Sequence, residues 1–188
     1  MKLGNFKYLL GIMLIVIICI IVFTRGDSDN KILVASKNIE YYFSQKDRNS
    51  DEELIEAIDS ARERVDMAIY ILQRQDIVNA VISAKKRGVV VRIITDRDEA
   101  ATNYEGKELK SLKREKIPIK INTHSGMMHM KVTILDNSSV AAGSYNYTDP
   151  ATEENDEVLV IVKNNIIAEK WENKFNNMWL DTGRFRNY

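Results

Sequence analysis

Val65–Thr95 is the stretch that decides the fold, with the sequence VDMAIYILQRQDIVNAVISAKKRGVVVRIIT. Val65–Leu72 is apolar enough for a strand, and Val89–Thr95 is a nearly continuous β-branched run, as expected of a strand covered on both faces. The segment between them has apolar residues at helical spacing. Asp76 can cap this helix, and Gly88 follows its last turn, where a left-handed conformation is needed. A strand–helix–strand unit of this kind predicts an α/β fold.

The same alternation continues on both sides of this unit. Ser50 and Glu53 form a capping-box pattern at the start of a helix, and a final helix presents large apolar residues on one face. Further strands are predicted at Ile39–Phe43, Ile117–Asn122, Met130–Asp136, Val140–Gly143 and Val158–Val162, and further helices near Tyr104–Lys116 and across Ile167–Met178. We therefore predict a mixed β-sheet flanked by helices on both faces.

The composition excludes several classes of protein. The chain has 188 residues, 45% of them apolar, and its 27 basic residues balance 27 acidic ones. An ordinary apolar fraction with few Gly and Pro residues excludes a disordered chain, and a single cysteine excludes a disulfide scaffold. Zero net charge argues against a strongly cationic nucleic-acid coat protein, although it permits a local basic site.

The N-terminal segment differs from the remainder of the chain. Residues 9–23, LLGIMLIVIICIIVF, carry no charge, and Lys2, Lys7 and Arg25 flank them. We expect a hydrophobic helix here, within a targeting segment and linker of residues 1–30 that precedes one catalytic domain at residues 31–188. An uncleaved membrane anchor, with the catalytic domain outside the cytoplasm, is favoured. The alternative is a cleaved signal peptide and a secreted protein, because Thr24-Arg25-Gly26 is a passable cleavage site.

Chemically active side chains are concentrated between His129 and Glu157. His129 and Lys131 are two residues apart, so on a strand they project from the same face. An imidazole beside an ammonium group suits a phosphate, because the ammonium neutralises oxygens while the imidazole acts as a nucleophile or an acid–base group near neutral pH. Ser144 and Asn146 also share a face, and both can hydrogen-bond phosphate oxygens.

Asp136 and Gly143 complete the pattern in a different way. Asp136 lies an odd number of positions from His129, so on a regular strand it points to the opposite face, and we assign it a structural or supporting role. Gly143 permits a close approach of the backbone or an irregular strand end.

Together these residues read His-x-Lys-x4-Asp-x6-Gly-Ser-x-Asn, which resembles the HKD signature of the phospholipase D superfamily in the form found in its small, single-motif bacterial nucleases. The resemblance covers nearly all of residues 39–180 and implies a phospholipase D-like α/β/α sandwich. It also implies a metal-independent phosphodiesterase without a cofactor, in which one histidine forms a phosphohistidine and a second protonates the leaving oxygen. The catalytic residues that it implies are His129, Lys131, Asp136, Ser144, Asn146 and Glu157, the last of which would orient or polarise a histidine.

One motif supplies only one such histidine. Single-motif members of the family form a homodimer with both motifs at the interface, so the resemblance implies a homodimer here. The competing source of a second histidine is His124, in the loop five residues earlier, although a lone loop histidine is usually only solvated.

The substrate class stays open between nucleic acid and phospholipid. Nucleic acid is favoured by the resemblance to small nucleases and by three basic clusters, each of which can also be a solvated surface. The clusters are Lys85, Lys86 and Arg87; Lys107, Lys110, Lys113, Arg114 and Lys116; and Arg184 and Arg186. The rival is a phospholipase D acting on the membrane that holds the N-terminal segment. A non-catalytic binding module is disfavoured, because every catalytic position of the motif is filled.

Overall fold

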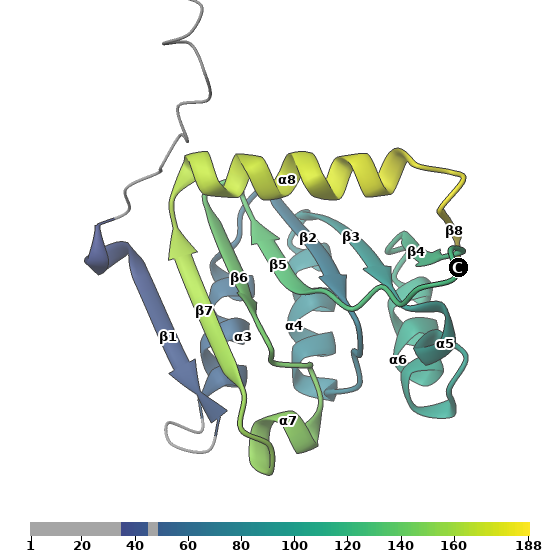
Figure 1. Ribbon diagram of the computed structural model, residues 1–188, viewed down its shortest axis with the longest axis horizontal. Helices are drawn as coiled ribbons and strands as arrows, with labels where there is room; N and C mark the ends of the chain where they lie inside the picture. Colours follow the sequence, from purple (N-terminus) through teal and green to yellow (C-terminus); the bar gives the residue numbers. More distant parts are fainter. Residues whose placement is uncertain (1–34, 45–48) are drawn as a thin grey trace, which may run out of the picture. The chain divides into compact units, whose positions relative to one another are not determined.

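The predicted strand–helix–strand unit forms the middle of an eight-stranded mixed sheet (Figure 1). The computed structural model describes residues 35–44 and 49–188. In it β2 (Arg64–Ile69) pairs in parallel with β3 (Val90–Thr95), and α4 (Gln75–Lys86) connects them. β3 in turn pairs in parallel with β4 (Ile119–Asn122). The three parallel strands therefore end at a common edge of the sheet.

Antiparallel strands extend the sheet on both sides of this parallel trio. The spatial order is β1-β7-β6-β5-β2-β3-β4-β8. The added strands are β1 (Ile39–Phe43), β7 (Val158–Lys163), β6 (Ser139–Gly143), β5 (Lys131–Leu135) and β8 (Phe185–Asn187). Every strand predicted from the sequence is present, with ends that differ by up to three residues. β8 was not predicted, because three residues are too few to show a period.

Helices cover both faces of the sheet, as the sequence predicts (Figure 1). α3 (Ser50–Ser60), α4 and α6 (Asn103–Arg114) pack on one face, and α8 (Asn165–Leu180) crosses the other. α5 (Arg97–Ala100), α7 (Asp149–Glu153) and a 3-10 turn at Ser36–Asn38 are short. α5 and α7 lie in segments for which the sequence predicted neither a helix nor a strand.

Side-chain alternation along the central strands divides the core into two layers. Met67 and Ile93 are fully buried under α3, α4 and α6, whereas their neighbours Ala68 and Ile94 pack toward α8 and Phe175. Removing a side chain of this size from water contributes about 1.5–3 kcal/mol. Burial on both faces explains the β-branched run of β3, which shows little polar alternation.

The ends of two helices differ from their sequence predictions. α3 has Asn49 at its N-cap instead of Ser50, and the Asn49 amide donates to Glu53 Oε1 at 3.1 Å, so the predicted Ser50–Glu53 capping box is wrong. Asp76 lies inside the first turn of α4, and Arg74 occupies the cap without a side-chain hydrogen bond. Gly88 follows α4 with φ +93°, so the predicted left-handed end is confirmed.

The predicted hydrophobic segment of residues 1–30 lies outside the described residues. Among residues 35–44 and 49–188, the helices are all too short or too polar to cross a membrane.

Candidate active site

Six strands bring their polar residues to one edge of the sheet. In β2 and β5, Ile69 opposes Lys131, and in β6 and β7, Gly143 opposes Leu159. The N-terminal ends of β5 and β7 therefore meet the C-terminal ends of β2, β3, β4 and β6. His129 and Glu157 precede β5 and β7, and Ser144 follows β6. The structure thus brings His129, Lys131, Ser144, Asn146 and Glu157 to the same edge.

His129 and Lys131 form a contacting pair, as their spacing predicts. Lys131 Nζ lies 3.2 Å from Nδ1 and 3.2 Å from Nε2 of His129, and it donates to the His129 carbonyl oxygen at 3.2 Å. The imidazole is exposed, whereas Lys131 is only 7% exposed. A phosphate that reaches this edge meets the imidazole first, with the ammonium group directly behind it.

Tyr70 is the third member of this arrangement. Its ring centroid lies 4.4 Å from that of His129 with a tilt of 49°, and Lys131 Nζ lies 4.8 Å from the Tyr70 centroid. The Tyr70 hydroxyl donates to Glu99 Oε1 at 3.0 Å. Burial, followed by the hydrogen bond and charge of Glu99, raises the pKa of the Tyr70 phenol, so it stays protonated and donates.

Lys131 is held in an environment that disfavours its charge. Burial lowers the pKa of Lys131, and the Glu157 carboxylate acts in the opposite direction. Glu157 is anchored by Ser44, which directly follows β1, because the Glu157 N–H donates to Ser44 Oγ at 2.9 Å. Ser44 in turn donates its N–H to the Glu157 carbonyl at 3.1 Å. Glu157 therefore supplies the compensating negative charge near Lys131.

The Gly-Ser-x-Asn segment is shaped by the approach of β7. A Cβ atom on Gly143 would lie 2.0 Å from the Val158 carbonyl oxygen, so only glycine fits there. Ser144 donates its N–H to that oxygen at 3.1 Å, and its Oγ accepts from the Val158 N–H at 3.2 Å. Asn146 Oδ1 is buried and has no hydrogen-bond partner among the described residues. An unmet buried acceptor costs about 1–3 kcal/mol, and Asn146 Oδ1 can accept one further hydrogen bond from a donor.

Asp136 lies at the other end of β5, in the turn after Leu135. Its carboxylate accepts the N–H groups of Arg62, Glu63 and Arg64, each at 2.8 Å. Although burial opposes its charge, these three amides hold the pKa of Asp136 below its ordinary value. Seven residues separate it from His129, about 20 Å at ~3.3 Å per residue. The structure therefore does not bring Asp136 to the other motif residues, and it places the carboxylate where it joins two backbone segments.

The sequence argument for Asp136 rested on the wrong geometry. Strand parity assumed a regular strand from Met130 to Asp136, but β5 ends at Leu135, and Asp136 has φ +51°. Its separation from His129 follows from the length of the strand, not from the face on which it points.

His124 lies apart from the His129–Lys131 pair. Its ring packs edge-on against Phe185 of β8, with centroids 5.8 Å apart. His129 instead lies beside β2, and β3 and β4 separate β2 from β8 in the sheet. Adjacent strands are about 4.8 Å apart, so the two imidazoles approach the edge from different strands and are separated by about 10 Å or more.

Two buried polar residues that sequence reasoning missed hold the loop that carries His129. Asp96 Oδ2 accepts the Met128 N–H at 2.8 Å, and Asn122 donates to the Gly126 carbonyl at 2.7 Å. Both residues directly follow or end a parallel strand, at the edge where polar groups meet in α/β sheets. That position was the signal available in the sequence for Asp96 and Asn122. Nothing comparable marked Tyr70, which falls inside the predicted strand Val65–Leu72.

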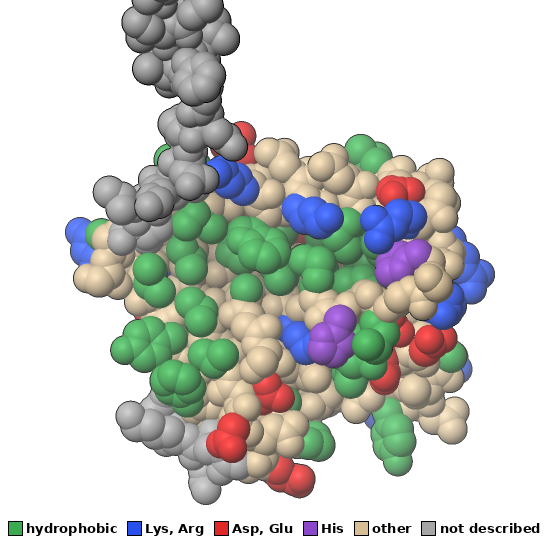
Figure 2. Space-filling view, viewed as in Figure 1, with side chains coloured by type: hydrophobic (Ala, Val, Ile, Leu, Met, Phe, Trp, Pro, Cys, Tyr) green, Lys and Arg blue, Asp and Glu red, His purple; other side chains and the backbone are tan. Residues whose placement is uncertain are grey.

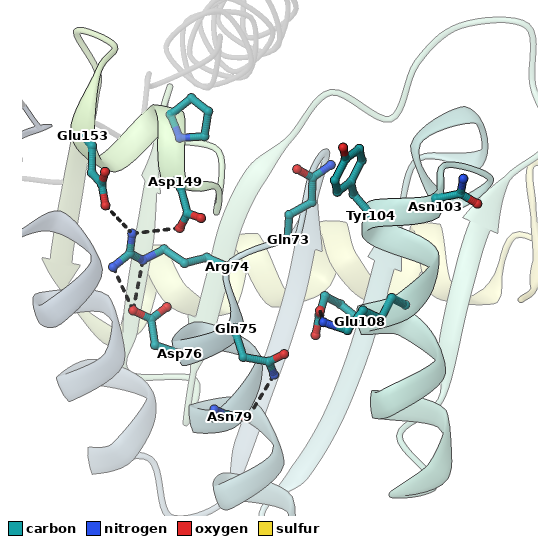
Figure 3. A pocket seen from close by; sticks show the side chains of 12 residues that line it. Gln73, Arg74, Gln75, Asp76, Asn79, Asn103, Tyr104, Glu108, Asp149 and Glu153 are labelled. Carbon is teal, nitrogen blue, oxygen red and sulfur yellow. Dashed lines mark hydrogen bonds and ion pairs between the residues drawn. The ribbon is translucent and has the colours of Figure 1, made fainter.

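A separate open hollow of about 1010 Å³ lies between the N-terminal ends of α4 and α6 and the short helix α7 (Figure 3). Arg74 reaches into it and pairs with Asp76, Asp149 and Glu153 at 2.9, 3.1 and 3.8 Å. Acidic side chains outnumber basic ones in its lining, so it is unsuited to a polyanion. Within the described parts of the chain, no group of three or more His, Cys, Asp or Glu side chains could hold a metal ion.

Comparison with known proteins identifies the domain to which this edge belongs. Residues 54–179 match the family profile described as "Cardiolipin synthase, PLD-like domain". The chain is 36% identical over 114 residues to a phospholipase D of Rickettsia conorii, which covers 61% of this chain and 56% of the relative. It is 29% identical over 119 residues to a mitochondrial cardiolipin hydrolase of Xenopus tropicalis, covering 63% and 56%. The chain thus spans little more than half the length of these relatives.

Solved structures show the same fold. Nuc from Salmonella typhimurium, a phospholipase D family member, superposes with a TM-score of 0.74 at 28% identity, over 80% of this chain and 97% of Nuc. NucT from Helicobacter pylori superposes with a TM-score of 0.67 at 27% identity, over 75% and 96%. The HKD pattern, the shared fold and the profile match all agree. The chain therefore belongs to the phospholipase D superfamily of hydrolases, whose PLD-like domain profile it matches over residues 54–179.

Proposed function

We propose that this protein is a phosphodiesterase that cleaves nucleic acid through a phosphohistidine, without a metal ion. The observation that carries the proposal is the exposed His129 imidazole with the Lys131 ammonium 3.2 Å from its ring nitrogens. This pair offers a nucleophile and a cation to the same phosphate. Ser144 and Asn146, at the same edge, are positioned to donate hydrogen bonds to phosphate oxygens.

The reaction divides into two displacements. A ring nitrogen of His129 attacks phosphorus, forming a P–N bond, while the P–O bond to the leaving group breaks and a second histidine protonates the departing oxygen. Water then attacks the phosphohistidine, the P–N bond breaks, and the second histidine, now neutral, accepts the proton from water. Each displacement is assisted by a placed acid or base, which contributes typically about 10²–10⁴-fold.

We further propose that the second histidine is His129 of the partner subunit in a homodimer. His124 is a poor alternative, because its ring packs on Phe185 at a different strand. Mixing wild-type and His129→Ala subunits tests this. If each site needs both subunits, equal mixing leaves about one quarter of the wild-type activity, since only one dimer in four is fully wild type. Retention of about one half would show independent subunits and contradict the dimer.

Nucleic acid is supported as substrate by the charges that border the site. Lys170 and Lys174 are exposed on α8, and neither forms an ion pair within the described residues. Glu172 and Asn176 lie on the flank of α8 that faces away from Lys170 and Lys174. Both accept hydrogen bonds from Arg92 of β3. Residues two positions apart on a helix project about 160° apart, so the two lysines lie on the flank of α8 opposite to the one that binds Arg92.

Figure 2 shows the resulting asymmetry, with basic side chains over α8, acidic side chains near α7, and hydrophobic ones between them over β1 and β7. A polyanion is therefore attracted along the α8 side and repelled from the α7 side. The hydrophobic side chains over β1 include Tyr41 and Phe43, which are 63% and 45% exposed, and such a surface also suits a lipid or a second subunit.

The substrate is identified by direct assay. The full chain is incubated with single- and double-stranded DNA, with RNA and with anionic phospholipid vesicles, with and without EDTA. Cleavage of nucleic acid that resists EDTA, disappears in His129→Ala and persists in His124→Ala supports the proposal. Release of lipid head groups alone would identify a phospholipase D instead, in line with the names of the curated relatives. Activity abolished by EDTA would contradict the metal-free mechanism.

We also propose that residues 1–30 direct the protein to a membrane, with the catalytic domain outside the cytoplasm. The support is the uncharged run of residues 9–23, flanked by basic residues. Fractionation of the full chain, followed by protease treatment of intact cells, tests both parts. Recovery in the soluble cytoplasmic fraction would overturn the proposal.

A further inference from the structure

Tyr70 contacts both members of the His129–Lys131 pair and is itself held by hydrogen bonds to neighbouring segments. Its ring contacts the His129 imidazole, with centroids 4.4 Å apart, and lies under Lys131 Nζ at 4.8 Å from the centroid. Its backbone N–H donates to the Met130 carbonyl, between these two residues, at 2.7 Å. Its hydroxyl is fixed by Glu99 at 3.0 Å.

We propose that Tyr70 is a positioning residue that holds the His129 imidazole for attack and keeps the partly buried Lys131 charged. The inference rests on the proposed function for its kinetic consequences, although not for the contacts themselves. Neither the HKD pattern nor the spacing of the site residues includes Tyr70.

The imidazole needs such support because it is exposed. An exposed histidine has two side-chain torsions free to rotate, and a nucleophile gains from being held close to its attack geometry. The Tyr70 ring covers one face of the imidazole, with a 49° tilt within the range of favourable aromatic contacts. It therefore restricts rotation of the imidazole, and Lys131 Nζ lies at the same distance, 3.2 Å, from both ring nitrogens.

The ammonium needs support because it is desolvated. Three groups face Lys131: the His129 imidazole from its own segment, the Glu157 carboxylate just before β7, and the Tyr70 ring just after β2. A cation over an aromatic face gains about 0.5–2 kcal/mol, most where water is excluded. Donation of the Tyr70 hydroxyl to the Glu99 carboxylate increases the electron density of the ring, which strengthens its attraction for the cation.

Two substitutions separate the ring from the hydroxyl. Tyr70→Leu removes the aromatic face, and Tyr70→Phe keeps it while losing the bond to Glu99. Tyr104→Leu is the matched control, because Tyr104 is 78% exposed on α6. The full chain is assayed with bis(p-nitrophenyl) phosphate, a small diester that needs no contact beyond the catalytic pair, across a range of pH.

We expect Tyr70→Leu to lower kcat by about 30-fold or more, with a smaller change in KM, because orientation is lost at the reacting group. The alkaline limb of its pH profile moves down by about half a unit to one unit, since Lys131 loses its proton more easily without the ring. Tyr70→Phe retains most of the activity, and Tyr104→Leu behaves as wild type. Equal behaviour of Tyr70→Leu and the control, or a Phe variant as defective as the Leu variant, would overturn the inference.

A measurement independent of catalysis keeps the test decisive. The chain has two histidines, so NMR resonances of His129 are assigned by comparison with His124→Ala. In the wild type and in Tyr70→Phe, the ring current of residue 70 shifts the His129 signals upfield, and in Tyr70→Leu they return toward solvent-exposed values. Lack of diester hydrolysis by the wild type, with this shift intact, would refute the proposed function and leave the contact established. Unshifted His129 signals in the wild type would overturn the inference.

Discussion

Replacing Asp136 by alanine separates the structural part of the HKD motif from its chemical part. The wild-type carboxylate accepts three backbone N–H groups, from Arg62, Glu63 and Arg64, at 2.8 Å. These bonds join the loop before β2 to the turn after β5, and they lie about 20 Å from His129 at ~3.3 Å per residue. We therefore expect the variant to lose stability but to keep its chemistry.

The loss is estimated from the bonds themselves. Each contributes about 0.5–1.5 kcal/mol at this partly exposed position, and alanine is also less suited than aspartate to the left-handed conformation at φ +51°. The total is about 3 kcal/mol, which lowers the Tm of a domain of this size by roughly 9 °C. Asp136→Asn, which tolerates the same conformation and keeps one acceptor oxygen, is expected to lose about half as much.

The pH dependence has a definite sign. The folded pKa of Asp136 lies below its unfolded value, so its stabilisation is present above an unfolded pKa of about 4 and is lost as pH falls through the folded value. The gap in stability between wild type and Asp136→Ala is therefore full at neutral pH and closes in acid. Denaturant unfolding at several pH values measures it, with Asp156→Ala, an exposed aspartate, as the control.

The activity of Asp136→Ala shows whether Asp136 takes part in the chemistry. Well below its Tm, Asp136→Ala should keep kcat within about threefold of wild type, whereas His129→Ala loses activity altogether. A loss of about 100-fold or more in correctly folded Asp136→Ala would refute the reasoning, because it would place Asp136 in the chemistry.

Three other predictions follow from single contacts. The double variant Lys170→Glu, Lys174→Glu should weaken binding of a short oligonucleotide about tenfold and reduce the slope of log binding constant against log salt concentration by about 1.5. The control Lys110→Glu, Arg114→Glu on α6 should change neither quantity. Equal effects of the two double variants would refute binding of nucleic acid along α8. Gly143→Ala should lower the free energy of unfolding by about 1–3 kcal/mol and reduce activity, because its Cβ would lie 2.0 Å from the Val158 carbonyl oxygen. Gly183→Ala is the control. Wild-type stability and activity of Gly143→Ala would contradict the close approach of the two strands. Burial raises the pKa of Glu105 to about 8, although the hydrogen bonds from Thr95 and Leu72 act to lower it. Because the carboxyl ionises more easily in the unfolded chain, the folded state becomes less stable as pH rises toward 8. The wild-type free energy of unfolding, measured with urea, should therefore fall by roughly 2 kcal/mol between about pH 6 and pH 8. Glu105→Gln should reduce this dependence of stability on pH. An unchanged dependence would show that Glu105 is ionised throughout.

Much of the architecture was predictable because its causes are local. The period of apolar residues identified β2, α4 and β3, and Gly88 marked the end of α4 through a conformation that side chains resist. The elements that were missed are short. Three residues of β8 and five of α7 do not complete enough turns or alternations to show a period.

The composition of the site was predictable in the same way, but its geometry was not. His129 and Lys131 are two residues apart, and a strand places them together without reference to any other part of the chain. The ring contact between Tyr70 and His129 and the loop anchor at Asp96 depend on pairings between segments about sixty and thirty residues apart. Such pairings are set by which faces of the strands are buried, not by local spacing.

The sequence by itself determined the alternation of strands and helices and the residues of the HKD pattern, because periodicity and motif spacing are properties of neighbouring residues. Only the tertiary structure decided which motif residues meet. The antiparallel register of β2 and β5 places Lys131 opposite Ile69 and Tyr70 beside His129. The length of β5 removes Asp136 to the far end of the sheet, where backbone amides bind it. Register and strand length result from packing the whole core, and no short segment contains that information.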